Sequence, residues 1–228
     1  MTIIFLLEER SMKEVLDIIL PKILPADVCF KTIPHSGKSD LQESIPRKLK
    51  AWRQPDVKFV IVQDQDSGDC VKIKEFLKGL AEPSGREALI RIACRELEAW
   101  YLGDLNAVSL AYGRDVRALA AKRKFRMPDQ LGNPKEELRK LFPAHQQLDG
   151  ARRIAVHMDV ENNASVSFWQ FVSGVRRLCG ESNNDRPEVI RNDMGRIGSL
   201  EGQDLIDPDY DIDACNDEIA EMFGVNDL

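Results

Sequence analysis

The strongest constraint on this chain is an apolar run that ends in two aspartates, at Val60–Asp66 (VIVQDQD). Such a run is typical of a strand that is buried on both faces of a parallel sheet. Because successive strand residues point to opposite faces, we expect Asp64 and Asp66 to share one side at the carboxyl end of this strand. Open α/β sheets bind their ligands at that end. The aspartate pair is therefore a candidate ligand site.

Two carboxylates held this close repel each other unless a cation lies between them. Carboxylate oxygens are hard ligands, so the expected cation is Mg²⁺ or Mn²⁺. The alternative is an ordinary strand-to-helix turn, in which Asp66 or Ser67 caps the next helix. The motif alone does not decide between these two interpretations.

Two further acids favour the metal interpretation. The chain opens with an apolar run that stops at Glu8 and Glu9, so Glu8 follows a strand-like segment as Asp64 does later. Glu98 follows another apolar run and lies among large apolar residues, where a carboxylate is rarely buried without a partner. For Glu98 the alternative is a structural acid that pairs with a nearby arginine.

Strand-like and helix-like segments alternate through the first hundred residues. This alternation predicts an α/β fold with a mostly parallel, four-stranded sheet flanked by helices. The expected strands are residues 2–7, 28–33, 57–62 and 88–93, and the expected helices of this part include 40–53 and 71–80. A capping box at Ser11 and Glu14 predicts the start of a helix that follows the first strand.

Beyond residue 104 the pattern becomes helical, with helices expected at 105–112, 116–124, 135–142, 148–158 and 167–178. We therefore expect three parts: an α/β core over residues 1–104, a helical extension over 105–180 that packs on the core, and an acidic tail over 181–228. The tail has few large apolar residues, a composition typical of disorder.

The charge differs sharply between these parts. Residues 181–228 hold 14 acids and three arginines, a net charge of −11, whereas residues 1–180 hold 29 bases and 24 acids, a net charge of +5. A basic body favours nucleic acid, DNA or RNA, as the partner. The bases cluster at Arg47–Arg53, Arg114–Arg126, Arg152–Arg153 and Arg176–Arg177. For any one cluster, a solvated helix face is the alternative.

The acids form a set that resembles the Toprim domain, the metal-binding module of topoisomerases, bacterial primases and overcoming-lysogenisation-defect nucleases. The resemblance rests on Leu6–Glu8, Val62–Asp66 and Leu97–Trp100, the last being similar to a signature of RloB-like Toprim proteins. With the segments around Lys38 and Trp169, the pattern over about residues 1–180 resembles bacterial Toprim-like proteins encoded beside an ATPase in phage-defence loci. Toprim domains carry glycine where this chain has Glu9.

The resemblance implies a Toprim-like core over residues 1–104 and a metal-dependent nuclease that cleaves phosphodiester bonds, the effector subunit of an ATPase-linked phage-defence system. It implies that Glu8, Asp64 and Asp66 hold the first ion, and that Glu98, with Glu9 as a substitute ligand, completes the shell or holds a second. Lys38 is the candidate cation for the phosphate. Its alternative is a surface lysine in a turn.

Two other functions remain open. One is a catalytically silent Toprim-like binding or sensor subunit of an ATPase complex. The other is a phosphoryl-transfer enzyme, because those enzymes also place aspartates at strand ends. Assembly into a homo-oligomer is a further option for the protein.

The remaining features concern the compartment. No apolar run approaches the roughly 20 residues that a membrane-spanning helix needs, and the first run lacks the basic flank of a signal peptide. The five cysteines are scattered and form no Cys-x-x-Cys pair. We therefore expect reduced thiols in a cytoplasmic protein that does not bind membranes.

Overall fold

The computed structural model describes residues 1–180, so the predicted acidic tail lies outside the described residues. Four strands form one sheet in the order β2-β1-β3-β4, and every neighbouring pair is parallel. Their bounds are β1 Thr2–Leu7, β2 Cys29–Pro34, β3 Val57–Asp64 and β4 Ala88–Ala93. The expected α/β fold with a four-stranded parallel sheet flanked by helices is confirmed.

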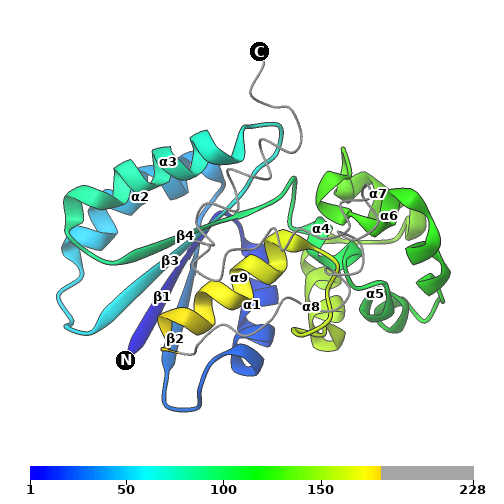
Figure 1. The fold of residues 1–228 in the computed structure, drawn as a ribbon, viewed down its shortest axis with the longest axis horizontal. Helices are drawn as coiled ribbons and strands as arrows, with labels where there is room; N and C mark the ends of the chain where they lie inside the picture. The colour runs from blue at the N-terminus through cyan, green and yellow to red at the C-terminus, as the bar shows by residue number, and fades with distance from the viewer. Residues whose placement is uncertain (181–228) are drawn as a thin grey trace, which may run out of the picture.

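Helices cover both faces of the sheet, which is why its central strands read as unbroken apolar runs. Alternate residues of β1 belong to two separate hydrophobic cores: Ile3, Phe5 and Leu7 face one, and Ile4 and Leu6 face the other. Helices α1 (Arg10–Ile23) and α9 (Val166–Leu178) contribute to the first core, and α2 (Lys38–Ala51) and α3 (Cys70–Ala81) to the second. Figure 1 shows these two helical layers with the sheet between them.

The helices between β4 and α9 group beyond the edge of the sheet at which the strands end (Figure 1). Their bounds are α4 Glu98–Leu102, α5 Leu105–Tyr112, α6 Arg123–Arg126, α7 Pro134–Leu141 and α8 Gln147–His157, with short 3-10 turns η2 Arg117–Ala121 and η3 Pro128–Gln130; a further turn, η1 Glu82–Ser84, follows α3. The prediction of one helix over 116–124 was wrong, because a 3-10 turn and a separate four-residue helix occupy that stretch.

The first helix begins two residues earlier than the capping box predicted. Glu9 occupies the N-cap position and Arg10 is the first helical residue. The Ser11 hydroxyl donates to the Glu9 carboxylate, so it is not available as an N-terminal cap. The capping-box prediction for Ser11 and Glu14 was therefore wrong, and the side chain of Glu14 contacts another helix instead.

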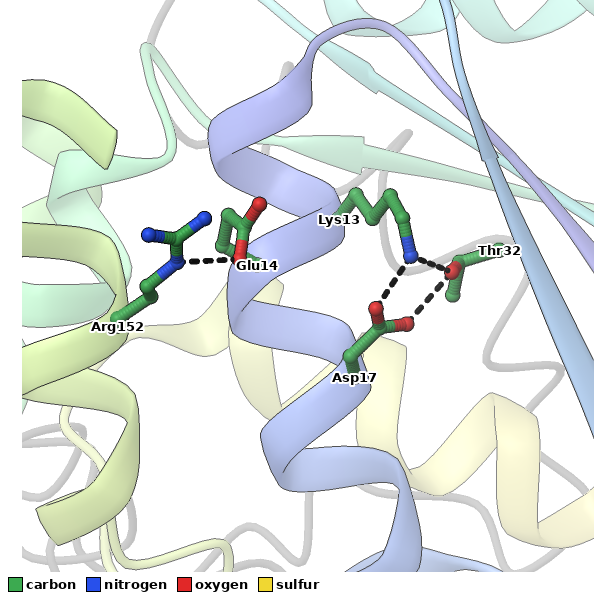
Figure 2. A network of polar contacts seen from close by, with 5 residues as sticks. All are labelled: Lys13, Glu14, Asp17, Thr32 and Arg152. Atoms are coloured by element: carbon green, nitrogen blue, oxygen red, sulfur yellow. Dashed lines mark hydrogen bonds and ion pairs between the residues drawn. The ribbon is translucent and has the colours of Figure 1, made fainter. Parts of the chain in front are cut away.

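Figure 2 shows how α1 is tied on two sides. On one side, Lys13 donates to Thr32 Oγ1 of β2 at 2.9 Å, and that hydroxyl donates to Asp17 Oδ1 at 2.6 Å. On the other side, Arg152 Nε of α8 donates to Glu14 Oε2 at 2.6 Å. Exposed ion pairs contribute at most about 1 kcal/mol each, so these contacts orient α1, while its buried apolar stripe supplies most of the stability.

No helix within residues 1–180 is long and apolar enough to cross a membrane.

Helix α9 packs closely on β4 at Gly174. A Cβ at this position would lie 2.3 Å from Arg91 Nη2. The buried Arg91 side chain has little room to move, because Nε and Nη1 donate to backbone carbonyls of Gln170 and Ile90. Gly174→Ala should therefore lower the free energy of unfolding by about 1–3 kcal/mol, measured by urea denaturation.

Gly79→Ala is the matched control, because Gly79 is an exposed residue of α3 whose new Cβ meets no atom within 4 Å. This change should raise the stability by roughly 0.5–1 kcal/mol, since alanine favours a helix over glycine. Equal effects of the two substitutions would contradict the close packing of α9 on β4.

Candidate metal-binding site

The site lies where the connections of two neighbouring strands leave the sheet on opposite faces. From β1 the chain crosses to β2 through α1 on one face, and from β3 it crosses to β4 through α3 on the other. Sheets of this type bind ligands in the crevice at such a point. Glu8 directly follows β1 and Asp64 ends β3. The backbone N–H of Asp64 donates to Glu8 Oε2 at 3.0 Å, so the structure brings these two acids together.

Two strained residues shape the turns at this edge. Asp66 (φ 54°) and Arg95 (φ 61°) adopt the left-handed conformation, which is uncommon for residues other than glycine. The Asp66 N–H donates to the Arg95 carbonyl at 2.7 Å, and the Arg95 N–H donates to Gln65 Oε1 at 2.9 Å, so each turn holds the other. Strained residues tend to collect at functional sites.

The turn also changes the expected relation between the two aspartates. Because β3 ends at Asp64 and Asp66 is left-handed, the alternation of an extended strand does not carry through to Asp66. Asp64 is buried, whereas the side chain of Asp66 is about half exposed. Neither Asp66 nor Ser67 caps the next helix, because Asp69 takes that position and accepts from the N–H groups of Val71 and Lys72.

Lys38 reaches the site as the first residue of α2, directly after Gly37 (φ 111°). Its Nζ lies 2.6 Å from Asp66 Oδ2. Partial burial lowers the pKa of Lys38, but the hydrogen bond to Asp66 and the charges of Asp66, Glu8 and Asp64 outweigh that effect and raise the pKa overall. The lysine is therefore a charged group at the same sheet edge as the acids.

Glu9 is held by the helical extension. Gln147 Nε2, at the start of α8, lies 2.8 Å from Glu9 Oε1 and 2.9 Å from Oε2. The charge of Glu9 acts on both Asp64 and Glu98, where it raises the pKa of each carboxyl group. Glu9 thus belongs to the acidic site, and a residue far along the chain fixes its position.

Glu98 enters the site as the first residue of α4 and is only 2 % exposed. Burial raises the pKa of Glu98 to about 7, and the charge of Lys135 on α7 opposes this rise. Tyr101 lies one turn further along α4, and its buried hydroxyl has no hydrogen-bond partner in the described part of the chain. Burial, followed by the charges of Glu98, Glu9 and Asp64, raises the pKa of Tyr101 well above its usual value.

Asp64 is the most strongly perturbed acid of the group. It is 8 % exposed, and its Oδ1 has no hydrogen-bond partner among residues 1–180. Burial raises its pKa well above the usual range, and the charges of Glu8, Glu9, Glu98 and Asp66 add to the rise. A buried carboxylate with an unused oxygen is strongly destabilised when it ionises without a cation. The donor chemistry therefore fits a hard divalent ion.

The present side-chain positions do not form a finished coordination shell. Within residues 1–180, no group of three or more histidine, cysteine, aspartate or glutamate side chains is placed so that it could hold an ion. Two candidate ligands point to other partners, since Asp66 contacts Lys38 and Glu9 contacts Gln147. Binding of an ion by this set requires these side chains to change partner.

His35 has a structural part close to this edge. Its Nδ1 donates to the Leu7 carbonyl at 2.8 Å, so Nε2 is an acceptor. Ser44 Oγ lies 2.6 Å from Nε2. Lys48 Nζ also lies 2.6 Å from Nε2. Burial, with the charge of Lys48, lowers the pKa of His35, although the Leu7 contact opposes the shift. Its two ring nitrogens are thus both engaged.

The sequence did not reveal three residues of this neighbourhood. Tyr101 carried a usable signal, because it stands three residues after Glu98 and so shares its helix face. Gln147 and Lys135 carried none, because their distance from the acids along the chain says nothing about contact. Only the packing of α7 and α8 brings them close.

Comparison with known proteins gives a family without an assigned activity. Residues 7–176 match the family described as "Domain of unknown function (DUF4276)". No curated protein and no solved structure matches the chain.

The raised pKa of Glu98 predicts a pH-dependent stability in metal-free buffer. A carboxyl group whose pKa rises from 4.5 to about 7 on folding stabilises the fold below pH 4.5, and this contribution is lost as the pH rises through about 7. The loss amounts to about 3 kcal/mol. We expect Glu98→Gln to abolish this part of the decline, measured as unfolding temperature between mildly acidic and mildly basic pH.

Glu75→Gln is the control, because it removes an exposed acid of α3 and should follow the wild-type pH dependence. If Glu98→Gln keeps the full wild-type decline, Glu98 is ionised in the folded protein throughout this range.

Proposed function

The chain belongs to the DUF4276 family, and we propose that it is a metal-dependent nuclease that hydrolyses phosphodiester bonds of DNA or RNA. One observation carries the proposal: at the carboxyl ends of the parallel strands, the buried carboxylate of Asp64 has an oxygen without a hydrogen-bond partner within residues 1–180, and the charges of four other acids act on it. Perturbed acids that share one crevice are typical of functional sites. The resemblance of the acidic set to Toprim domains supports the same reaction.

Mg²⁺ or Mn²⁺ is the cofactor that the donor set fits, with Glu8, Asp64 and Asp66 as its ligands and Glu98 and Glu9 completing the shell or holding a second ion. When bound, such an ion polarises a phosphodiester and activates water. The protein itself supplies the cation Lys38, which exchanges its contact with Asp66 for an oxygen of the substrate phosphate. This exchange frees Asp66 as a ligand and places positive charge where the reaction develops negative charge.

A catalytically silent subunit of an ATPase complex is the second candidate. The side-chain positions favour it, because two candidate metal ligands already have other partners. Lys38 forms an ion pair with Asp66, and Gln147 donates a hydrogen bond to Glu9. As a nuclease, the protein would act as the effector subunit of an ATPase-linked phage-defence system, the role that the Toprim-like resemblance implies. Assays with and without an ATPase partner distinguish a latent nuclease from a silent subunit.

Metal binding should appear as stabilisation even before any activity is found. At pH 7.5, a divalent ion at 100 times its dissociation constant adds about 2.7 kcal/mol to the free energy of unfolding. We expect MnCl₂ to raise the unfolding temperature of the wild type, and Asp64→Asn to remove this response. In metal-free buffer Asp64→Asn should be as stable as the wild type or more stable, because it removes a buried, repelled charge.

The corresponding control is Asp27→Asn. It changes an exposed aspartate just before β2, at the opposite end of the strands from the acidic site. It should keep the full response to MnCl₂. A strong loss of stability of Asp64→Asn in metal-free buffer would mark Asp64 as a structural acid instead.

Cleavage is the direct test of the proposed function. Labelled DNA and RNA, incubated with the full chain and Mn²⁺ or Mg²⁺, should be cut by the wild type and by Asp27→Asn. Asp64→Asn should lower the rate by at least about 100-fold, the scale expected when charge stabilisation in a site is lost. No cleavage of either nucleic acid, with or without an ATPase partner, would favour the silent subunit.

A further inference from the structure

A cluster of bases covers one segment of the helical extension. Residues 113–141, called the basic arm below, hold nine lysines and arginines against four acids, and residues 116–128 hold five bases and no glutamate or aspartate. The apolar side of the arm is fixed, because four of its side chains are buried in the first hydrophobic core, the one that also contains α1 and α9. They are Val116, Phe125, Leu131 and Leu138. The bases are therefore held on the outer side of a packed segment.

Few acids of the described chain neutralise this surface. Lys124 and Lys140 share a single partner, Glu137, and Arg117 pairs with Asp115. Lys122 and Arg123 are exposed and form no ion pair or side-chain hydrogen bond with any residue of 1–180. The arm thus keeps several uncompensated positive charges.

The arm is anchored beside the acidic site. The backbone N–H of Lys135 on α7 donates to Glu96 Oε2 at 2.9 Å, and the charge of Lys135 acts on Glu98. At the η3 turn, the partly buried Asp129 accepts from the Ser165 hydroxyl at 2.7 Å and from the Ser167 N–H at 2.8 Å, at the start of α9. In Figure 1, α6 and α7 lie beyond α4, on the side away from the sheet.

We propose that the basic arm binds the phosphate backbone of the nucleic acid and leads it to the acidic site. This inference rests on the proposed nuclease function. Acids alone repel a polyanion, so a substrate strand needs a neighbouring surface of fixed positive charge before it can reach the carboxylates. The exposed bases at α6 supply that surface, because α7 holds the basic arm close to Glu98. Phosphate contacts of this kind give affinity without sequence preference.

The test compares two double variants that remove the same charges. Lys122→Gln/Arg123→Gln neutralises the arm. Lys50→Gln/Arg53→Gln neutralises one exposed lysine and one exposed arginine of the rival basic cluster around the end of α2, for which we expect the alternative, a solvated helix face. This cluster lies next to the start of β3, at the opposite end of the strands from the acids. Binding of a short labelled DNA duplex and of the matching single strand is measured on the full chain in EDTA, over a range of salt concentrations.

We expect the arm variant to bind at least tenfold more weakly at low salt, with a salt slope about 1.4 units smaller on single strands and about 1.8 on duplex, for two lost phosphate contacts. The α2 variant should stay within about twofold of the wild type. The proposal is overturned if the two variants weaken binding equally, if neither does, or if the wild type binds neither DNA at low salt.

The outcome separates this inference from the proposed function, because EDTA prevents metal-dependent cleavage while binding is measured. Arm-dependent binding without cleavage in the presence of Mn²⁺ would leave the arm as a nucleic-acid surface and remove the nuclease. Cleavage that depends on Asp64 but not on Lys122 and Arg123 would keep the nuclease and remove the arm as its substrate surface.

Discussion

The parallel sheet of this protein is stable only because both of its faces are covered, and the rest of the structure depends on that requirement. Each parallel connection must pass over one face, and the chain meets this with α1 on one side and α2 and α3 on the other. The change of side between β1 and β3 falls at the carboxyl ends of these two strands. Glu8 and Asp64 meet at this point, so the covering of the sheet and the location of the site have one cause.

Repulsion among buried acids dominates the electrostatics of this site. Burial and mutual repulsion raise the pKa of Glu8, Asp64 and Glu98. Lys38 and Gln147 relieve part of this repulsion by contacting Asp66 and Glu9. These two contacts give the metal-free site a stable arrangement, and they are also the contacts that a bound cation would replace. The acids together create a negative potential, which disfavours their own ionisation and would stabilise a bound cation.

The helical extension does more than enlarge the core. Through α8 it positions Glu9 by way of Gln147, and through α7 it sets Lys135 beside Glu98. It also carries the exposed bases of the basic arm next to the acids. The site is therefore built from both parts of the described chain. A polyanionic substrate would meet positive charge on the extension and candidate ligands on the sheet.

The sequence by itself determined the strands and the acids that follow them. Unbroken apolar runs specify strands buried on both faces, and parallel strands bring their carboxyl ends to one edge, so Glu8 and Asp64 could be placed together without a structure. Local signals failed where several conformations compete, as in the helix expected over 116–124 and the capping box at Ser11. The contact of Lys38 with Asp66, the left-handed turn at Asp66 and the partners Gln147 and Lys135 were decided only by the tertiary structure. These contacts join segments far apart in the chain, and no local pattern records which distant side chain fills the space beside a given carboxylate.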